Sequence, residues 1–261
     1  MNQNLQLLQN KVCVIVGASS LRGIGYATAE LFARHGAKIV ALDIAMNDDV
    51  AKGIAQEIET NTGITADVLG VQVDIQSPES CNAAIKAAVD RFGTIDCLVN
   101  SAAIVNGKGM LSIPSDEFDQ MIGVNLKGAF NICQSAIRVF VEKQSGTIVN
   151  LASSAAQRGG GLVGGPHYAA SKGGVISLTR TIAREFGPQG IRANVICPAM
   201  IETSMLDVLD ETRLAGIIDA IPLKKAGRPL DAANACLFLA SDMSAFVTGA
   251  TVDVNGGTHI H

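Results

Sequence analysis

Short apolar runs alternate with helical patterns along the whole chain. The runs, rich in Val and Ile, occupy residues 12–16, 38–43, 68–73, 97–100, 147–151, 192–197 and 251–254. Continuous apolar runs of this length are typical of strands that are buried on both faces of a parallel sheet. We therefore expect a strand at each of these positions.

Helical periodicity fills the segments between the runs. The first segment shows i, i+3, i+4 spacing in Ile24, Ala27, Thr28, Leu31 and Phe32. Gly36 stands where that helix would end. Ser77 and Pro78 are typical of a helix start, and Gly93 closes the helix that they open. The alternation predicts an α/β fold, a doubly wound parallel sheet with helices on both faces, and with no linker or repeat we expect a single domain over residues 1–261.

The composition excludes several classes of protein. The 261 residues carry 20 Lys and Arg against 24 Asp and Glu, a net charge of −4, and 48% of them are hydrophobic. This balance excludes a disordered chain, and the lack of a basic block argues against nucleic-acid binding. No run approaches the ~20 apolar residues of a membrane span, and the first residues lack the pattern of a signal peptide.

The cysteines and histidines predict neither disulfides nor a metal site. The six cysteines, at positions 13, 81, 97, 133, 197 and 236, form no CxxC pair and have no histidine at metal-ligand spacing. We expect them to be reduced core residues of a cytoplasmic protein. His259 and His261 are not expected to bind a metal.

The first predicted strand runs into a glycine-rich turn that opens a helix. Gly17, Gly23, Ile24 and Gly25 lie in this turn. Glycines let the backbone approach a pyrophosphate, and the helix start supplies N–H donors, so we predict a dinucleotide site. Asp43, eighteen residues after Gly25, favours NAD because a carboxylate accepts the ribose hydroxyls and repels a 2′-phosphate. Arg22 favours NADP, since its guanidinium could hold that phosphate.

Tyr168 and Lys172 lie four residues apart in a helical segment, on one face. A nearby ammonium favours the phenolate form of Tyr, whose ordinary pKa is ~10. The pair therefore suits a general acid/base for a carbonyl–alcohol interconversion. The alternative is a Tyr that is hydrogen-bonded in a core.

Several motifs, in the same order as in the family, make the sequence resemble the short-chain dehydrogenase/reductases. The resemblance is to the compact, single-domain branch with a Rossmann fold, close to the 3-oxoacyl carrier-protein reductases. Besides the glycine turn, the motifs are VDI at 73–75, LVNSAA at 98–103, VNLKGAF at 124–130, IVNLAS at 148–153, YAASK at 168–172, IRANVICPAMIET at 191–203 and VNGG at 254–257. Ser101 and Ala103 depart from the family's NNAG motif, and Leu21 with Arg22 looks like a two-residue insertion.

The resemblance implies four catalytic residues. Beside Tyr168 and Lys172 these are Ser153, which would hydrogen-bond the substrate oxygen, and Asn125, which in the family bends a helix and holds a water that links the Lys to solvent. The gap from Ser153 to Tyr168 is two residues longer than usual, so Ser154 is the second choice. Either Ser could instead be a helix cap, and the Asn could simply satisfy backbone groups at a helix irregularity.

The resemblance also implies further cofactor contacts. Asp74 and Ile75 would lie near the adenine, Asn100 would follow the fourth strand, and Ile201 would lie beside the carboxamide. Tyr168 and Lys172 would also reach the nicotinamide ribose.

Other expectations concern the substrate side and the assembly. Residues 200–223 are either a mobile substrate lid, as in the family, or a pair of fixed helices. His167 either faces the substrate or lies on the surface at a helix start. The glycine-rich stretch at 159–165 and the apolar lid favour a small or medium, non-anionic substrate. The resemblance implies a homotetramer formed by the helices around 127–141 and 168–186.

Three functions remain in competition. The leading hypothesis is an oxidoreductase that transfers hydride between NAD(H) and a secondary alcohol or ketone through Ser153, Tyr168 and Lys172. The alternative is an NADPH-dependent 3-oxoacyl carrier-protein reductase. The third is a non-catalytic dinucleotide-binding protein, which would have no need of a paired Tyr and Lys.

Overall fold

The predicted apolar runs form the strands of a parallel sheet. The computed structural model describes residues 6–160, 163–207 and 210–261. Within these residues seven strands pair in the order β3-β2-β1-β4-β5-β6-β7. Each strand lies within one residue of its predicted bounds: β1 Val12–Val16, β2 Lys38–Asp43, β3 Val68–Gln72, β4 Cys97–Asn100, β5 Gly146–Leu151, β6 Ile191–Pro198 and β7 Thr251–Val254.

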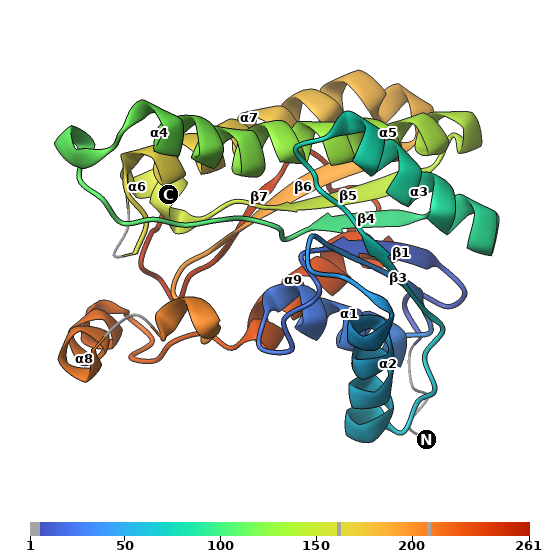
Figure 1. Ribbon diagram of the computed structural model, residues 1–261, viewed down its shortest axis with the longest axis horizontal. Coiled ribbons are helices and arrows are strands. Elements are labelled where there is room, and N and C mark those ends of the chain that lie inside the picture. The colour runs from blue at the N-terminus through green and yellow to red at the C-terminus, as the bar shows by residue number, and fades with distance from the viewer. Residues whose placement is uncertain (1–5, 161–162, 208–209) are drawn as a thin grey trace.

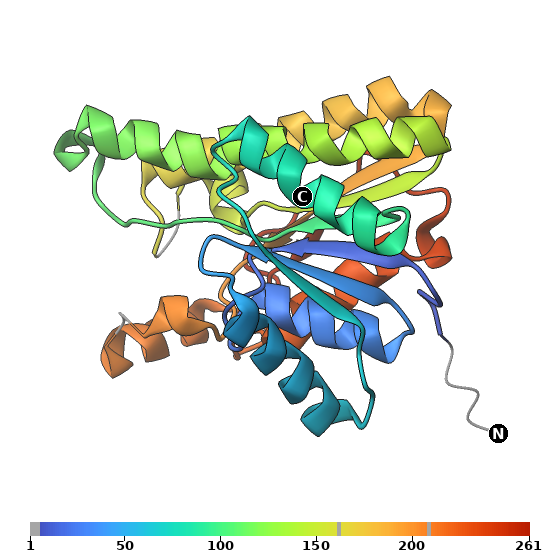
Figure 2. The same cartoon turned by 45° about the vertical axis from the view of Figure 1, so that its right-hand side comes forward.

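Helices cover both faces of the sheet, as predicted for a doubly wound fold. Those described are α1 Ile24–Arg34, α2 Asp48–Thr62, α3 Pro78–Phe92, α4 Ser115–Ile122, α5 Gly128–Lys143, α6 Ser154–Arg158, α7 Pro166–Phe186, α8 Glu211–Ala220 and α9 Pro229–Ala240. Helices α3, α5 and α7 lie on one side of the sheet and α1, α2 and α9 on the other (Figure 1), and the turned view keeps the same two layers (Figure 2). This is the layering that right-handed βαβ crossovers produce.

The helix ends follow the predicted signals. The Ser77 side chain accepts a hydrogen bond from the backbone N–H of Ser80 at the start of α3, and Gly93 ends that helix at φ +80°. Gly36, after the last residues of α1, has φ +84°. Glycine adopts this left-handed conformation without strain, which explains its place at both helix ends.

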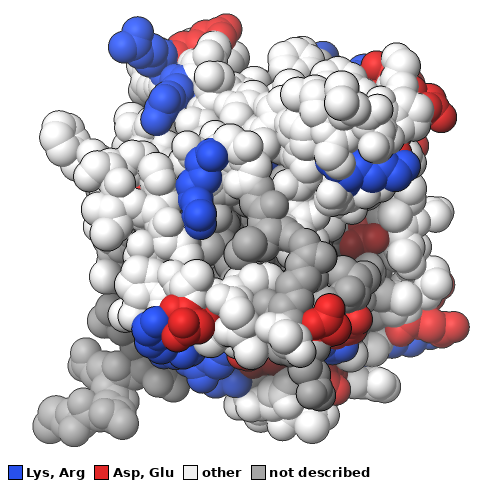
Figure 3. Space-filling model, turned by 90° about the vertical axis from the view of Figure 1, so that its left-hand side faces the viewer, with Lys and Arg blue, Asp and Glu red and all other residues white. Residues whose placement is uncertain are grey.

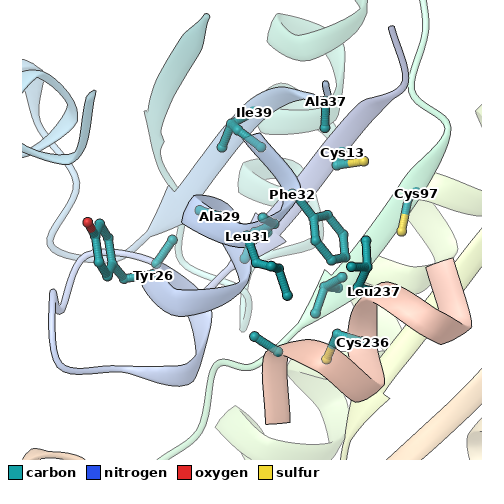
Figure 4. Packing of buried hydrophobic residues seen from close by; sticks show 14 of the residues in the cluster. Cys13, Tyr26, Ala29, Leu31, Phe32, Ala37, Ile39, Cys97, Cys236 and Leu237 are labelled. Atoms are coloured by element: carbon teal, nitrogen blue, oxygen red, sulfur yellow. The ribbon is translucent and has the colours of Figure 1, made fainter. Parts of the chain in front are cut away.

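Apolar side chains from the sheet and both helix layers form the core. Between β1 and the helices α1 and α9, Phe32 packs with Leu237 and Cys236 (Figure 4). All six cysteines lie in the described part of the chain, and each is buried and free. This confirms that they act as small apolar core residues.

The strand order reverses between β1 and β4, which pair side by side with Val16 opposite Asn100. From β1 the sheet extends through β2 to β3, and from β4 it extends through β5 and β6 to β7. At such a reversal the loops after the two strands diverge and leave a crevice at the carboxyl ends of the strands. Of the helices in the described residues, none is long and apolar enough to cross a membrane.

Candidate active site

The turn after β1 brings its backbone close to the neighbouring strand. Gly17 has φ +81°, and a Cβ there would lie 2.8 Å from the backbone nitrogen of Ala102. A Cβ on Gly25 would overlap the carbonyl oxygen of Gly17. Only glycine therefore fits at these two positions.

The first turn of α1 is free to bind an anion. The helix begins at Ile24 after Gly23, and among the described residues no side chain caps it. Uncapped N–H groups at a helix start are donors at the positive end of the helix dipole, which is where phosphate binds in proteins.

A cavity of about 430 Å³ lies beside this turn. Its walls include many of the residues predicted to bind the cofactor: Gly17, Gly23, Ile24, Gly25, Asp43, Asp74 and Ile75. The Asp43 carboxylate accepts hydrogen bonds from the backbone N–H groups of Ser19 (3.1 Å) and Ala45 (3.0 Å), which hold it at the end of β2. The glycine cradle, the uncapped helix and the fixed carboxylate together fit a dinucleotide.

Arg22 and Asn100 do not line this cavity. The Arg22 guanidinium binds the Asp207 carboxylate through two hydrogen bonds of 2.8 Å, so it points to the segment predicted as a lid. Asn100 is buried at the end of β4, and its Oδ1 has no hydrogen-bond partner among the described residues. Their contact with the cofactor stays a prediction.

A second cavity of about 520 Å³ adjoins the first and holds the predicted catalytic group. Ser153, Tyr168, Lys172 and Ile201 line it. Ser101 and Thr203 lie in the walls of both cavities, so the two spaces share a boundary. Both had escaped prediction as site residues.

Tyr168 and Lys172 lie on the first turns of α7, as the YAASK motif predicted. The buried Lys172 amine donates a hydrogen bond to the Leu151 carbonyl oxygen (2.7 Å) at the end of β5. The Tyr168 ring lies against Gly164, where a Cβ would overlap the ring. A glycine two residues before the helix therefore leaves the space that the ring occupies.

Burial dominates the pKa values of this pair. Burial lowers the pKa of Lys172 to about 8, and the neighbouring Cys197 opposes the shift. Burial raises the pKa of Tyr168, and the hydrogen bond with Ser153 lowers it in part. We had expected the Lys172 ammonium to favour the phenolate. In the cofactor-free protein the loss of hydration outweighs any such effect, because it disfavours both charged forms.

Ser153 is both a helix cap and a partner of Tyr168. Its hydroxyl oxygen accepts a hydrogen bond from the backbone N–H of Ala155 (3.1 Å) at the start of α6. The hydroxyl proton is then available to donate towards the cavity, and its bond to Tyr168 stabilises the phenolate. Ser154 also lines the cavity.

Asn125 lies in a π-helical turn, Gly123–Lys127, between α4 and α5. Its side chain accepts a hydrogen bond from the Ile104 N–H and donates one to the Ile104 carbonyl oxygen, both at 2.9 Å. It also donates to the Ser171 hydroxyl (3.1 Å), one residue before Lys172. The predicted irregularity is therefore present as this π-helical turn. Through Asn125 the turn is hydrogen-bonded to the loop after β4 and to α7.

The segment at 200–223 contains two short helices, η4 Ser204–Leu206 and α8, and residues 208–209 lie outside the described residues. Leu206, Ile217 and Ile221 line the catalytic cavity. At its start the segment is tied down by a β-bridge between Ile201 and Gly227. Of the glycine-rich stretch, Gly161 and Leu162 also lie outside the described residues.

His167 takes neither of its two expected positions. Its side chain is buried, with Nε2 3.4 Å from Oε1 of Glu117 on α4, and it does not line the catalytic cavity. The other oxygen of Glu117 binds the Lys108 amine. Glu117 lies 50 residues from His167 in the sequence, so no local pattern could indicate this contact.

Comparisons with known proteins agree with this geometry. A family model described as enoyl-(acyl carrier protein) reductase matches residues 17–259. The chain is 43% identical over 259 residues to an uncharacterized short-chain type dehydrogenase/reductase, y4mP, of Sinorhizobium fredii, covering 98% of this chain and 100% of that protein. It is 36% identical over 253 residues to the 3-oxoacyl-[acyl-carrier-protein] reductase FabG of Thermotoga maritima, covering 96% and 98%.

Solved structures show the same fold. The crystal structure of gox2181 superposes with a TM-score of 0.90 at 29% identity and covers 99% of both chains. The chain therefore belongs to the short-chain dehydrogenase/reductase family. It is an NAD(P)-dependent oxidoreductase that acts on CH–OH groups and the corresponding ketones.

Proposed function

We propose that the protein interconverts a secondary alcohol and its ketone with NAD(H), using Ser153, Tyr168, Lys172 and Asn125. One observation carries the proposal: the Ser153, Tyr168 and Lys172 side chains line a single cavity that shares a wall with the dinucleotide cradle. A substrate oxygen placed between Ser153 and Tyr168 would lie next to the cofactor.

When bound, the nicotinamide dinucleotide accepts or supplies the hydride. Tyr168 takes the hydroxyl proton of the alcohol, or returns it to the ketone oxygen, as a general base or acid. The Ser153 hydroxyl donates a hydrogen bond to the same oxygen and holds the charge that develops there. Its own oxygen accepts from the Ala155 N–H, which keeps the side chain in place.

Lys172 fixes the geometry of the site and tunes its charge. Its bond to the Leu151 carbonyl anchors the amine at the end of β5. With a pKa lowered to about 8, the amine exchanges protons near neutral pH and can pass one towards Tyr168. Asn125 holds the loop after β4 against α7, where a water could connect Lys172 to solvent.

Asp43 supports NAD as the cofactor. Its carboxylate is fixed by two backbone N–H groups at the cavity wall, where a ribose 2′-phosphate would meet a negative charge. Arg22, the residue that could favour NADP, is engaged by Asp207.

A 3-oxoacyl carrier-protein reductase that uses NADPH is the second candidate, because the relatives of Thermotoga maritima and of several other bacteria carry that name. Turnover of a 3-oxoacyl carrier-protein thioester with NADPH, in clear preference to free alcohols with NAD, would favour this candidate.

The protein is further proposed to be a cytoplasmic homotetramer whose subunits meet through α5 and α7, with residues 200–223 as the substrate lid. The free, buried state of the cysteines supports a reducing compartment. The exposed Phe130 on α5 supports a contact on that helix.

A nicotinamide absorbance screen of alcohols and ketones with NAD and with NADP tests the proposal. The wild type is expected to prefer NAD, and Asp43→Ala is expected to reduce that preference at least tenfold, because the ribose hydroxyls lose their acceptor. An unchanged ratio of kcat/KM for the two cofactors in Asp43→Ala would refute the role of Asp43.

A further inference from the structure

The catalytic cavity has an unbalanced positive charge. Among its described lining residues, the charged side chains are Lys172 and Arg158, and there is no Asp or Glu. Lys172 is buried and its amine binds the Leu151 carbonyl. Arg158 is therefore the cation that a ligand in this cavity can reach.

Within the described part of the chain, the Arg158 guanidinium has no polar partner. Arg158 is the last residue of α6 and is exposed, and it makes no hydrogen bond or ion pair with any described residue. Of the other arginines whose side chains are described, Arg184 also lacks a partner. The remainder each have one: Arg22, Arg34, Arg91, Arg138, Arg180, Arg192 and Arg228.

Two other cations from the loops that adjoin the cavity are already neutralised. Arg22 binds Asp207, and Lys108 binds Glu117. On the face at the carboxyl ends of the strands, Lys and Arg are few and scattered among uncharged surface (Figure 3). The unpaired Arg158 is therefore not part of a general basic patch. Its position in the cavity wall suggests instead that it binds a ligand there.

We propose that Arg158 binds a carboxylate of the substrate, so that the enzyme acts on a hydroxy acid and the corresponding oxo acid. A guanidinium pairs with a carboxylate through two parallel hydrogen bonds, a geometry that a solvated Lys does not offer. The inference deepens the function proposed above and depends on it for the reaction.

The position of Arg158 limits where that carboxylate lies. Arg158 follows Ser153 by five residues on α6, which places its backbone about 7–8 Å further along the helix axis. The side chains of both residues line the same cavity. A carboxylate a few bonds from the reacting carbon therefore reaches Arg158 while the hydroxyl reaches Ser153 and Tyr168.

The rest of the cavity suits an apolar chain. Leu206, Ile217 and Ile221 approach from the lid segment, and Val105 and Val163 from the opposite loops. Burial of methylene groups against such side chains removes apolar surface from water and so favours binding. An acid with a short alkyl chain matches these walls better than a polyol does.

A phosphate of the cofactor is a poor alternative for Arg158. The glycine turn and Asp43, which would hold the pyrophosphate and the ribose, line the other cavity, and Arg158 does not contribute to that cavity. The sequence had favoured a non-anionic substrate because the stretch around residue 160 and the lid are apolar. Arg158 directly precedes the glycine-rich stretch at 159–165, as the last residue of α6, and its side chain lines the cavity.

Binding of two matched compounds tests the inference without any turnover. Hexanoate and hexanamide have the same shape and differ in charge, and neither carries a hydroxyl to oxidise. In the enzyme saturated with NADH, calorimetry or ligand-observed NMR is expected to show hexanoate binding at least tenfold more tightly. Arg158→Gln should remove this preference, and Arg184→Gln, the matched control on α7, should keep it.

Equal affinity of the two compounds in the wild type, or a preference that survives in Arg158→Gln, would overturn the inference. A second arm compares 2-, 3- and 4-hydroxyhexanoate with their methyl esters. The acid-to-ester ratio of kcat/KM is expected to fall at least tenfold in Arg158→Gln. Failure of every alcohol with both cofactors would contradict the proposed function, while the binding preference would still decide the role of Arg158.

Discussion

Gly25 marks the closest approach between the turn after β1 and the start of α1. A methyl group there would overlap the Gly17 carbonyl oxygen and reach the Ser101 hydroxyl. The turn and the start of α1 would have to move apart, which displaces the N–H groups that are to hold the pyrophosphate.

Gly25→Ala is therefore expected to weaken NADH binding at least tenfold in a fluorescence titration and to lower the thermal midpoint. Gly53→Ala on α2 is the matched control, because a Cβ there meets no atom within 4 Å. This control is expected to stabilise the protein by about 0.5–1 kcal/mol, since alanine is the better helix former. Unchanged NADH affinity in Gly25→Ala would contradict the close approach.

Lys172 gives the cofactor-free protein a distinctive dependence of stability on pH. Its pKa is about 8 in the folded protein, against about 10.4 in an unfolded chain. The unfolded state binds the extra proton between these values, so the free energy of unfolding rises with pH from about 8 to 10.4. Below pH 8 the full cost of burying the charged amine is present.

Lys172→Met has no amine to titrate. The free energy of unfolding of the wild type minus that of the variant is expected to increase by about 2–3 kcal/mol between pH 8 and 10.4. Buried thiols such as Cys133 and Cys236, whose pKa values burial raises to about 12, act in the opposite direction. They are present in both proteins and cancel. Denaturant titrations across this range would contradict the account if the difference stays flat.

Local sequence predicted the residues whose roles are set by their neighbours in the chain. The glycine turn and the Tyr168–Lys172 pair depend on backbone conformation and on helical spacing, and both are found where expected. The partners of Arg22 and His167 lie 185 and 50 residues away, at Asp207 and Glu117. Such contacts exist only after the elements have packed, so no local pattern could indicate them.

At the scale of elements, the π-helical turn at Gly123–Lys127 holds the wall of the site. Asn125 from this turn satisfies both backbone groups of Ile104, in the loop that forms part of both cavity walls. The sequence indicated an irregular helix only through the resemblance to a family, because π-turns have no strong signature of their own.

Asn125→Ala is expected to destabilise the protein by about 2–4 kcal/mol, because the N–H and carbonyl groups of Ile104 lose their partner. It should also lower kcat, since the loop and α7 lose the link through Ser171. Denaturant unfolding and steady-state kinetics measure the two effects. A variant with wild-type stability and wild-type kcat would show that the turn does not support the site.

The ends of the elements followed simple rules where side chains or glycines cap them, as at Ser77 and Gly93. The lid segment was less predictable. The two alternatives, a mobile lid and a pair of fixed helices, differ in how the segment moves, and both would show the same pattern of apolar residues in the sequence. The structure adds two restraints on this segment, the bridge from Ile201 to Gly227 and the ion pair from Asp207 to Arg22.

For the molecule as a whole, the strand positions and the doubly wound arrangement followed from the apolar runs and the handedness of crossovers, while the order of the strands came from the structure. Strands buried on both faces leave continuous Val- and Ile-rich runs, such as Val12–Val16, that are hard to confuse with amphipathic helices. The reversal of strand order then locates the crevice before any catalytic residue is considered. The substrate was beyond this reasoning, because side chains from α6, α7, the lid and several loops define its cavity together.

Replacement of Tyr168 tests the central claim, that one cavity beside the dinucleotide cradle performs the proton transfer of an alcohol–ketone reaction. In Tyr168→Phe, kcat on the best alcohol of the screen is expected to fall at least 100-fold, because a general acid/base contributes about 10²–10⁴. The dissociation constant for NADH, measured by fluorescence in the same preparation, is expected to stay within about threefold of the wild type. Undiminished turnover in Tyr168→Phe would contradict the account.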